Sequence, residues 1–184
     1  MFRLDLSRAA ERVGFSFQQI ADFKDALPYF LRAAEVAEAL IAADPNDRDA
    51  RYAHIVAILR IGESQLGLAR LKAADATFRR HLELCRRYAE KDADDAAGQR
   101  LLGVAFYKMA EVETARAKTE SLTDEQRADH WREAMAWLRN CRDVFIDMRA
   151  RKMLPAADVG VPDEIAEEIA TCDAELEGLV HDDQ

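Results

Sequence analysis

Glycine, proline and cysteine are scarce in this chain of 184 residues, which holds 7 Gly, 4 Pro and 3 Cys. So little turn-forming material, together with abundant Ala, Leu, Glu and Arg, favours helices along nearly the whole length. The cysteines, Cys85, Cys141 and Cys172, are widely spaced and form no Cys-x-x-Cys pair. They fit small apolar packing in a reducing compartment better than disulfides. We therefore expect an all-α protein without structural disulfides.

Long apolar runs and an excess of positive charge are missing as well. No stretch approaches the roughly 18 uncharged apolar residues of a membrane span, and the first residues lack the apolar core of a signal peptide. The formal charge is −9, which speaks against a dedicated nucleic-acid-binding surface. These absences predict a cytoplasmic protein that binds neither nucleic acid nor membrane.

The main feature of the sequence is that it repeats itself, at a constant shift that places Gly14 on Gly62 and both on Ala110. Apolar residues in each repeat follow the three-four spacing of two amphipathic helices. The third repeat accommodates an insertion, 119–130, in which Thr123 begins a sequence typical of a helix-capping box. We predict one domain, 1–184, with repeats at about 3–46, 47–94 and 95–154. The expected helices span about 5–21, 23–43, 47–69, 71–91, 95–118 and 123–152.

The last part of the chain departs from the repeats. Residues 155–162 have the composition of a linker, and an amphipathic segment follows them. An isolated amphipathic helix is unstable in water, so we predict a C-terminal capping helix at about 162–180 that covers the open apolar face of the last repeat. The apolar stripe expected to make this contact consists of Ile165, Ile169, Cys172, Leu176 and Leu179.

Small and aromatic residues recur inside the repeats at fixed spacing. Gly14 is followed by Ala26 and Phe30, and Gly62 is followed at the same two distances by Ala74 and Phe78. This spacing resembles that of tetratricopeptide repeats, in which a small residue lets the first helix approach the second and an aromatic residue fills the gap. The resemblance implies an α-α superhelix of three helical hairpins plus the capping helix. The period, at about 48 residues, is longer than the roughly 34 residues usual for the family.

The long period and the boundary at 44–47 are similar to those of long-helix arrays in bacterial signalling proteins, notably those with eukaryotic-like Ser/Thr kinase domains. The kinase itself needs a Gly-rich phosphate loop and HRD and DFG segments, and this sequence has none of them. The resemblance therefore implies a separate interaction module, either free-standing or from a larger protein.

In arrays of this family the first helices of successive repeats line a concave groove, which the resemblance implies as a binding site. Arg12, Arg60 and Lys108 recur at one position, where they suit an acidic segment of a partner. Pairing of Arg60 and Lys108 with glutamates of their own helices is the alternative. Four groove residues, Phe15, Leu59, Leu66 and Tyr107, are apolar or aromatic and are expected to face solvent. The full set of predicted partner-binding residues is Arg8, Arg12, Phe15, Gln18, Val56, Leu59, Arg60, Glu63, Leu66, Val104, Tyr107, Lys108 and Glu111.

Catalytic and metal chemistry find little support in the sequence. His81 and Cys85 share a helix face at a spacing of four, but a zinc site needs a second ligand pair that we do not find. No nucleophile has an evident base and orienting group. We therefore expect no cofactor, no metal and no enzymatic activity.

The predicted function is a non-catalytic scaffold or adaptor that binds a protein or peptide partner. Two alternatives stay open. One is self-association through the N-terminal hairpin, where Phe2, Leu4 and Leu6 have no preceding helix to cover them. The other is a regulatory C-terminal segment of a larger bacterial signalling enzyme. A basic run on the second helices is expected to pair with acidic neighbours, with phosphate or membrane contact as its alternative.

Overall fold

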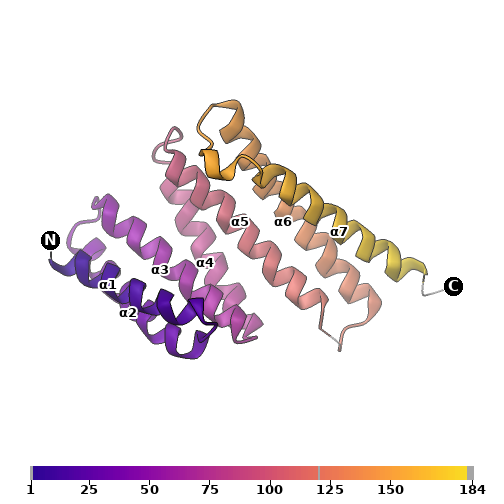
Figure 1. Cartoon of the computed structure of the whole chain (residues 1–184), viewed down its shortest axis with the longest axis horizontal. Helices are drawn as coiled ribbons and strands as arrows, with labels where there is room; N and C mark the ends of the chain where they lie inside the picture. The colour runs from indigo at the N-terminus through magenta and orange to yellow at the C-terminus, as the bar shows by residue number, and fades with distance from the viewer. Residues whose placement is uncertain (1, 120, 182–184) are drawn as a thin grey trace. The chain divides into compact units, whose positions relative to one another are not determined.

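The computed structural model describes residues 2–119 and 121–181, and every regular element in this part of the chain is a helix (Figure 1). This confirms the predicted all-α class. Each predicted helix limit lies within three residues of the observed one. The elements are α1 (Phe2–Gln19), α2 (Phe23–Ala43), α3 (Arg48–Gly67), α4 (Leu71–Ala89), α5 (Ala96–Ala117), α6 (Asp124–Ala150), a short 3-10 helix η1 (Ala156–Asp158) and α7 (Val161–His181).

The chain divides inside α4 into two compact units, residues 1–84 and 85–184. In unit 1, α2 packs against both α1 and α3. In unit 2, α6 packs in the same way against α5 and α7, and α7 runs alongside α6 in Figure 1. We call α1, α3, α5 and α7 the A helices, and α2, α4 and α6 the B helices. Each unit thus contains a B helix covered by two A helices.

Aspartate and threonine side chains begin several helices at the places that the sequence predicts. Asp47 accepts a hydrogen bond from the backbone N–H of Ala50 at 2.9 Å, and Asp95, the equivalent residue of the next repeat, accepts from Ala97 at 3.3 Å. Such caps satisfy backbone donors that have no partner within the helix. Thr123 and Gln126 form the predicted capping box at the start of α6. The insertion is therefore a loop followed by an extended helix start.

Two A helices end with the same backbone turn. Ala21 and Ala69 have positive φ angles of 58° and 55°. The residues after them donate back to the helix, Asp22 to the Phe17 carbonyl at 3.0 Å and Arg70 to the Gln65 carbonyl at 2.8 Å. This is the Schellman turn, in which glycine usually occupies the positive-φ position because a Cβ is unfavourable there. The shared turn sends the chain from each A helix into its B helix in the same way.

The glycine-to-aromatic spacing brings the helices of unit 1 into close contact. A Cβ added to Gly14 would lie 2.7 Å from Cε1 of Phe30, and one added to Gly62 would overlap the ring of Phe78. Both aromatic rings are fully buried. These rings are the partners that the repeat spacing predicts, so the close approach of α1 to α2 and of α3 to α4 is confirmed.

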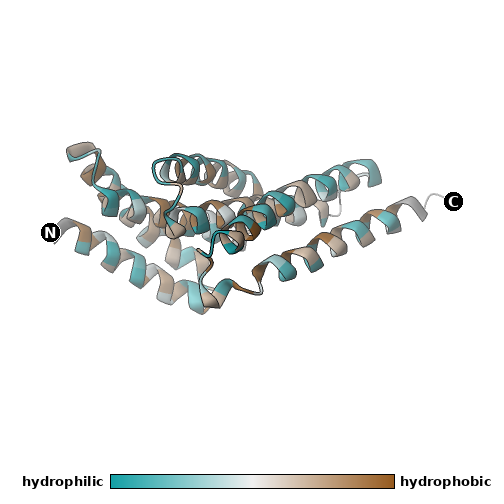
Figure 2. Cartoon of the chain, turned by 90° about the horizontal axis from the view of Figure 1, so that it is seen from above, coloured by the Kyte–Doolittle hydropathy of each residue, from teal (hydrophilic) through white to brown (hydrophobic). Residues whose placement is uncertain are grey.

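Each unit has its own apolar core. In unit 1, Ala57, Ile58 and Ile61 of α3 pack with residues of α2 that include Phe30. In unit 2, residues of α5, α6 and α7 share one cluster that includes the predicted α7 stripe. Figure 2 shows apolar and polar residues alternating along the helices, as expected for amphipathic helices packed through one face. Within the described part of the chain, no helix combines the length and apolar character needed to cross a bilayer.

Candidate functional site

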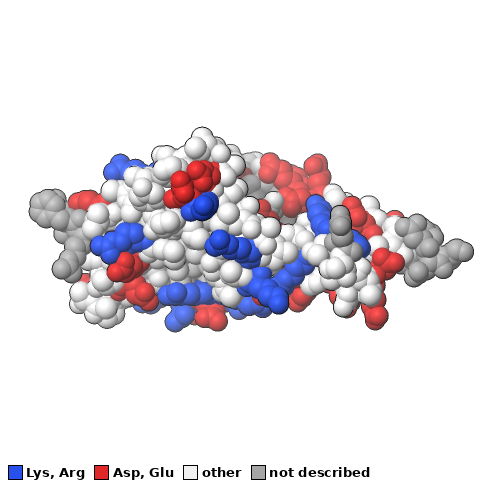
Figure 3. Space-filling model, turned by 90° about the horizontal axis from the view of Figure 1, so that it is seen from below, with Lys and Arg blue, Asp and Glu red and all other residues white. Residues whose placement is uncertain are grey.

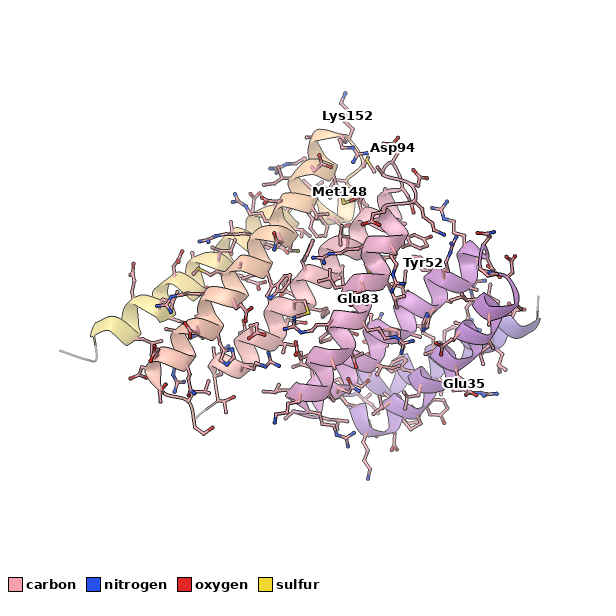
Figure 4. All side chains as sticks on the ribbon, turned by 180° about the vertical axis from the view of Figure 1, so that it is seen from behind. Glu35, Tyr52, Glu83, Asp94, Met148 and Lys152 are labelled. Carbon is pink, nitrogen blue, oxygen red and sulfur yellow. The ribbon has the colours of Figure 1, made fainter. Side chains whose placement is uncertain are left out.

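The A helices of unit 1 enclose a cleft of about 210 Å³ between α1 and α3. Its floor includes Ser7, which is buried and donates a hydrogen bond to the Ala33 carbonyl of α2 at 2.9 Å. Small side chains at the floor keep the space open. Along the α3 wall lies Tyr52, labelled in Figure 4, which is 42% exposed. The complete lining is Ser7, Arg8, Glu11, Asp49, Tyr52, Ala53 and Val56.

Polar contacts join the two walls of this cleft. Arg8 of α1 lies 3.5 Å from Asp49 of α3 in an exposed ion pair. Such a pair contributes only about 0–1 kcal/mol, so a ligand can displace it at little cost. Arg8 and Val56 are predicted site residues that line the cleft, whereas Tyr52 and Asp49 line it without being among the predicted residues. The spacing of 49, 52, 53 and 56 is the signal that places these four residues on one helix face.

Arg60 is the centre of a second polar cluster on the same side of unit 1. Its guanidinium lies 2.9 Å from Glu63 of its own helix and 3.7 Å from Glu11 of α1. It also lies 4.8 Å above the ring of Phe15, within the range of a cation–π contact. Gln18 completes the cluster with a 2.9 Å hydrogen bond to Glu63. The alternative reading of Arg60, pairing with a glutamate of its own helix, is therefore the one found.

The expected exposure of the predicted residues is only partly correct. Leu59 is 9% exposed and belongs to the buried residues, so the expectation that it faces solvent is wrong. Leu66 is half-buried, and Phe15 is exposed beneath Arg60. Arg12 is exposed, and no ion pair involves it within residues 2–119 and 121–181. Of the recurring basic groups in unit 1, Arg12 is therefore the one not engaged by a glutamate.

In unit 2, the predicted residues Val104 and Tyr107 of α5 face helix α7. Val104 and Tyr107 line a cleft between α5 and α7. The Tyr107 hydroxyl donates to Glu168 of α7 at 2.9 Å, and its ring is half-buried. Tyr107 is therefore only partly open to solvent, and its hydroxyl is engaged by an exposed carboxylate of α7. Helix α7, which the sequence predicts as a cap, also serves as a wall of this cleft.

Lys108 and Glu111 form an ion pair of 2.8 Å within α5. Lys108 is thus engaged by its own helix, as Arg60 is in unit 1. On the face of the molecule in Figure 3, basic and acidic side chains lie next to one another in several places. Since both groups are largely neutralised, the structure gives little support to recognition of an acidic segment through Arg60 and Lys108.

A buried carboxylate of α5 contacts the last residue of the insertion in unit 2. Glu113 is fully buried and contacts Arg116 at 2.6 Å and Nδ1 of His130 at 2.7 Å. His130 belongs to the extended start of α6, so this cluster fastens the insertion to α5. Figure 4 shows the opposite end of α6, where Asp94 lies beside Lys152 and accepts a hydrogen bond from Arg151 at 2.5 Å. Both ends of α6 are therefore held by charged contacts.

The cysteine thiols are poorly suited to nucleophilic chemistry. Cys85 and Cys141 are buried, and desolvation raises the pKa of each thiol to about 12. Thiolate, the reactive form, is therefore a negligible fraction at neutral pH. His81 is also buried. Within the described residues, no group of three or more His, Cys, Asp or Glu side chains is arranged to hold a metal ion.

Buried histidine in unit 1 has a packing role. His54 lies on the face of α3 that includes Ile61. Burial is the main reason that the pKa of His54 is lowered, with a smaller contribution from Arg80 that Glu38 opposes. The imidazole is therefore held in the neutral form, as suits a side chain packed among other helices.

No protein-family model matches the chain, and a search of curated proteins finds no match to it.

Proposed function

We propose that the chain is a non-catalytic protein-binding module of the tetratricopeptide-like type, in which the A helices hold a segment of a partner protein. The observation that carries this proposal is the α1–α3 cleft of unit 1. It has an open volume, a small-residue floor and a partly exposed tyrosine on its wall. Tyrosine in such a setting is enriched at binding hot spots because it offers a large apolar surface and a hydrogen-bonding group.

The contacts around the cleft favour an apolar anchor in the partner over an acidic one. Arg60 is already neutralised by two glutamates, and Arg8 is paired with Asp49. Tyr52 and Val56, by contrast, retain exposed apolar surface along the cleft. We infer that an apolar side chain of the partner enters between α1 and α3, and that exposed Arg12 contacts the partner's backbone or a carboxylate beside it. We also propose that the protein acts in cytoplasmic bacterial signalling. This part of the proposal rests on the family resemblance alone.

Affinity measurements on matched tyrosine variants test the proposal. Peptides that bind the full chain are selected from a displayed library of random dodecapeptides, and their affinities are then measured by fluorescence anisotropy. Tyr52→Ala is expected to weaken binding about 30-fold, the effect of losing a hot-spot aromatic. Tyr29→Ala is the control, because Tyr29 is similarly exposed at 39% but lies on α2, outside the cleft lining. Equal affinities for the two variants would count against the cleft.

A second candidate function, self-association, has its own supporting observation. Leu6, Val13 and Ile20, along α1 and just after its end, are 48%, 42% and 73% exposed, and they recur at every seventh position. The corresponding face of α3, which includes Ile61, packs against α2. An uncovered A-helix face is a surface on which a second copy can pack.

Light scattering coupled to size exclusion tests self-association. The proposal expects the average mass to rise with protein concentration in the wild type and to stay at that of one chain in Val13→Glu. Leu31→Glu, at an exposed leucine of α2, is the matched control that keeps the rise. If the wild-type protein has the mass of one chain at all concentrations, self-association is ruled out as a function.

A further inference from the structure

The cleft between α5 and α7 in unit 2 has an apolar interior. It encloses about 210 Å³, with Cys141 and Phe145 of α6 among its floor residues. Phe145 and Ile165 are buried, and Val104 and Val161 are half-buried. Such a lining suits the aliphatic part of a side chain, since its burial removes apolar surface from water.

The α7 wall of this cleft carries two carboxylates that no basic side chain of the described residues neutralises. Arg100 is committed to Asp158, with hydrogen bonds of 2.7 Å and 3.3 Å from its guanidinium to the two carboxylate oxygens. Glu164 and Glu168 lie one turn apart on the same face of α7, and neither has an ion pair with Lys, Arg or His in the described part of the chain. Two like charges at this spacing weaken a helix, so a cation placed between them is stabilising.

Tyr107 fixes the position of one of these carboxylates. Its hydroxyl donates to Glu168, and burial together with that hydrogen bond raises the pKa of Tyr107, so the hydroxyl stays protonated at neutral pH. The aromatic ring adds an electron-rich surface beside the carboxylates. Lys108 lies 5.8 Å from the ring and is paired with Glu111. The described part of the chain therefore leaves the acidic wall without a cation of its own.

We propose that the α5–α7 cleft binds a lysine or arginine side chain of the partner polypeptide. The aliphatic stem contacts Val104, Phe145 and Ile165, and the charged end lies between the carboxylates of Glu164 and Glu168. Lysine and arginine combine a long apolar stem with a terminal cation, which is the combination that this lining complements. The inference rests on the proposed function, because it names the chemistry of the partner that the A helices hold.

The test compares peptide pools that differ at one position. Four pools of capped decapeptides, degenerate in neutral residues elsewhere, carry Lys, Arg, norleucine or Glu at the fifth position, and their binding to the full chain is measured by fluorescence anisotropy. We expect the Lys and Arg pools to bind about tenfold more tightly than the norleucine pool at low salt, as for two partly exposed ion pairs. The preference shrinks at about 1 M salt because the charges are then screened.

The variant Glu164→Gln/Glu168→Gln separates charge from shape. Glutamine keeps the size of the side chain and an oxygen that accepts from Tyr107, so the fold is retained and the preference for Lys and Arg over norleucine is lost. Asp163→Asn/Glu167→Gln is the matched control, since it removes two exposed charges at the same spacing on α7 outside the cleft lining. This control keeps the preference.

The outcomes distinguish failure of the cation-binding inference from failure of the proposed protein-binding function. If the pools bind the wild type with no preference for Lys or Arg, or if both double variants behave alike, the inference is wrong while the proposed function stands. If no pool binds and display selection yields no ligand, the proposed function fails and takes the inference with it. Loss of the preference in the cleft variant alone supports both.

Discussion

The α1–α3 cleft of unit 1 and the α5–α7 cleft of unit 2 are built on the same plan and differ in charge. The α3 wall uses residues 49, 52, 53 and 56, and the α7 wall uses residues 161, 164, 165 and 168, with identical spacing. In unit 1, Asp49 is paired with Arg8 across the cleft. In unit 2, Glu164 and Glu168 have no ion-pair partner within the described residues. The two clefts thus share the spacing of their wall residues and differ in how the charges at the rim are paired.

The two units also differ where the first A helix packs on its B helix. Ser7 on α1 corresponds to Gly103 on α5 at a shift of two repeats. Ser7 donates to the Ala33 carbonyl, whereas a Cβ on Gly103 would lie 2.6 Å from the ring of Phe145. At this position α1 is joined to α2 by a hydrogen bond, and α5 packs its bare backbone against an aromatic ring of α6.

The largest expected effect concerns the buried carboxylate that distinguishes unit 2 from unit 1. The position of Glu113 is occupied in α1 by Phe17, which stacks on Tyr29 with ring centroids 5.6 Å apart. Arg116→Met should destabilise the fold by about 3 kcal/mol, since it leaves a buried charge without its main partner. Urea denaturation followed by circular dichroism measures this change.

Arg132→Met is the control for that experiment. Arg132 forms an exposed ion pair of 2.8 Å with Asp129 on the same helix as His130, and its loss should cost less than about 1 kcal/mol. Similar losses of unfolding free energy for Arg116→Met and Arg132→Met would show that Arg116 is not needed to stabilise buried Glu113.

Much of the helical fold can be predicted from the sequence, whereas most contacts of the candidate site cannot. The helix limits, the caps at Asp47 and Thr123 and the contacts of Gly14 and Gly62 follow from local rules and the repeat. The exposure of Leu59 does not, because helical periodicity identifies an apolar face, while the burial of a residue beside that face depends on the neighbouring helix.

Contacts between helices account for the other differences between the predicted and the observed site. The pairing of Arg60 with Glu11, and of Tyr107 with Glu168, joins residues far apart in the sequence, and no spacing rule indicates it. The tail covers an apolar face as the sequence predicts, but its polar side also completes a cleft with α5. Recognising α7 as a further A helix from its 161, 164, 165 and 168 spacing would have predicted that cleft.

A medium effect is expected at Gly103 and at the corresponding Ser7. Gly103→Ala should destabilise the fold by about 2 kcal/mol, because the added methyl group overlaps a buried ring that cannot move freely. Ser7→Ala should cost about 1 kcal/mol, the typical loss of one buried hydrogen bond. Urea midpoints rank the two variants, and a Gly103→Ala protein as stable as the wild type would rule out the tight contact with Phe145.

The smallest effect is a gain in stability at the turns that end α1 and α3. Ala21→Gly and Ala69→Gly should each stabilise the fold by about 0.5–1 kcal/mol, since glycine adopts positive φ without steric cost. Ala10→Gly, inside α1, is the control and should destabilise by about 1 kcal/mol. A loss of stability in the two turn variants would contradict the shared turn geometry.

Mapping the binding surface tests the central claim most directly. A display-selected peptide is added to the ¹⁵N-labelled full chain, and the backbone amide shifts are followed by NMR. Binding by the A helices predicts the largest shifts at residues that line the α1–α3 cleft, including Tyr52 and Val56, or the α5–α7 cleft, including Tyr107 and Glu164. Shifts confined to the outer faces of α2, α4 and α6 would contradict the claim.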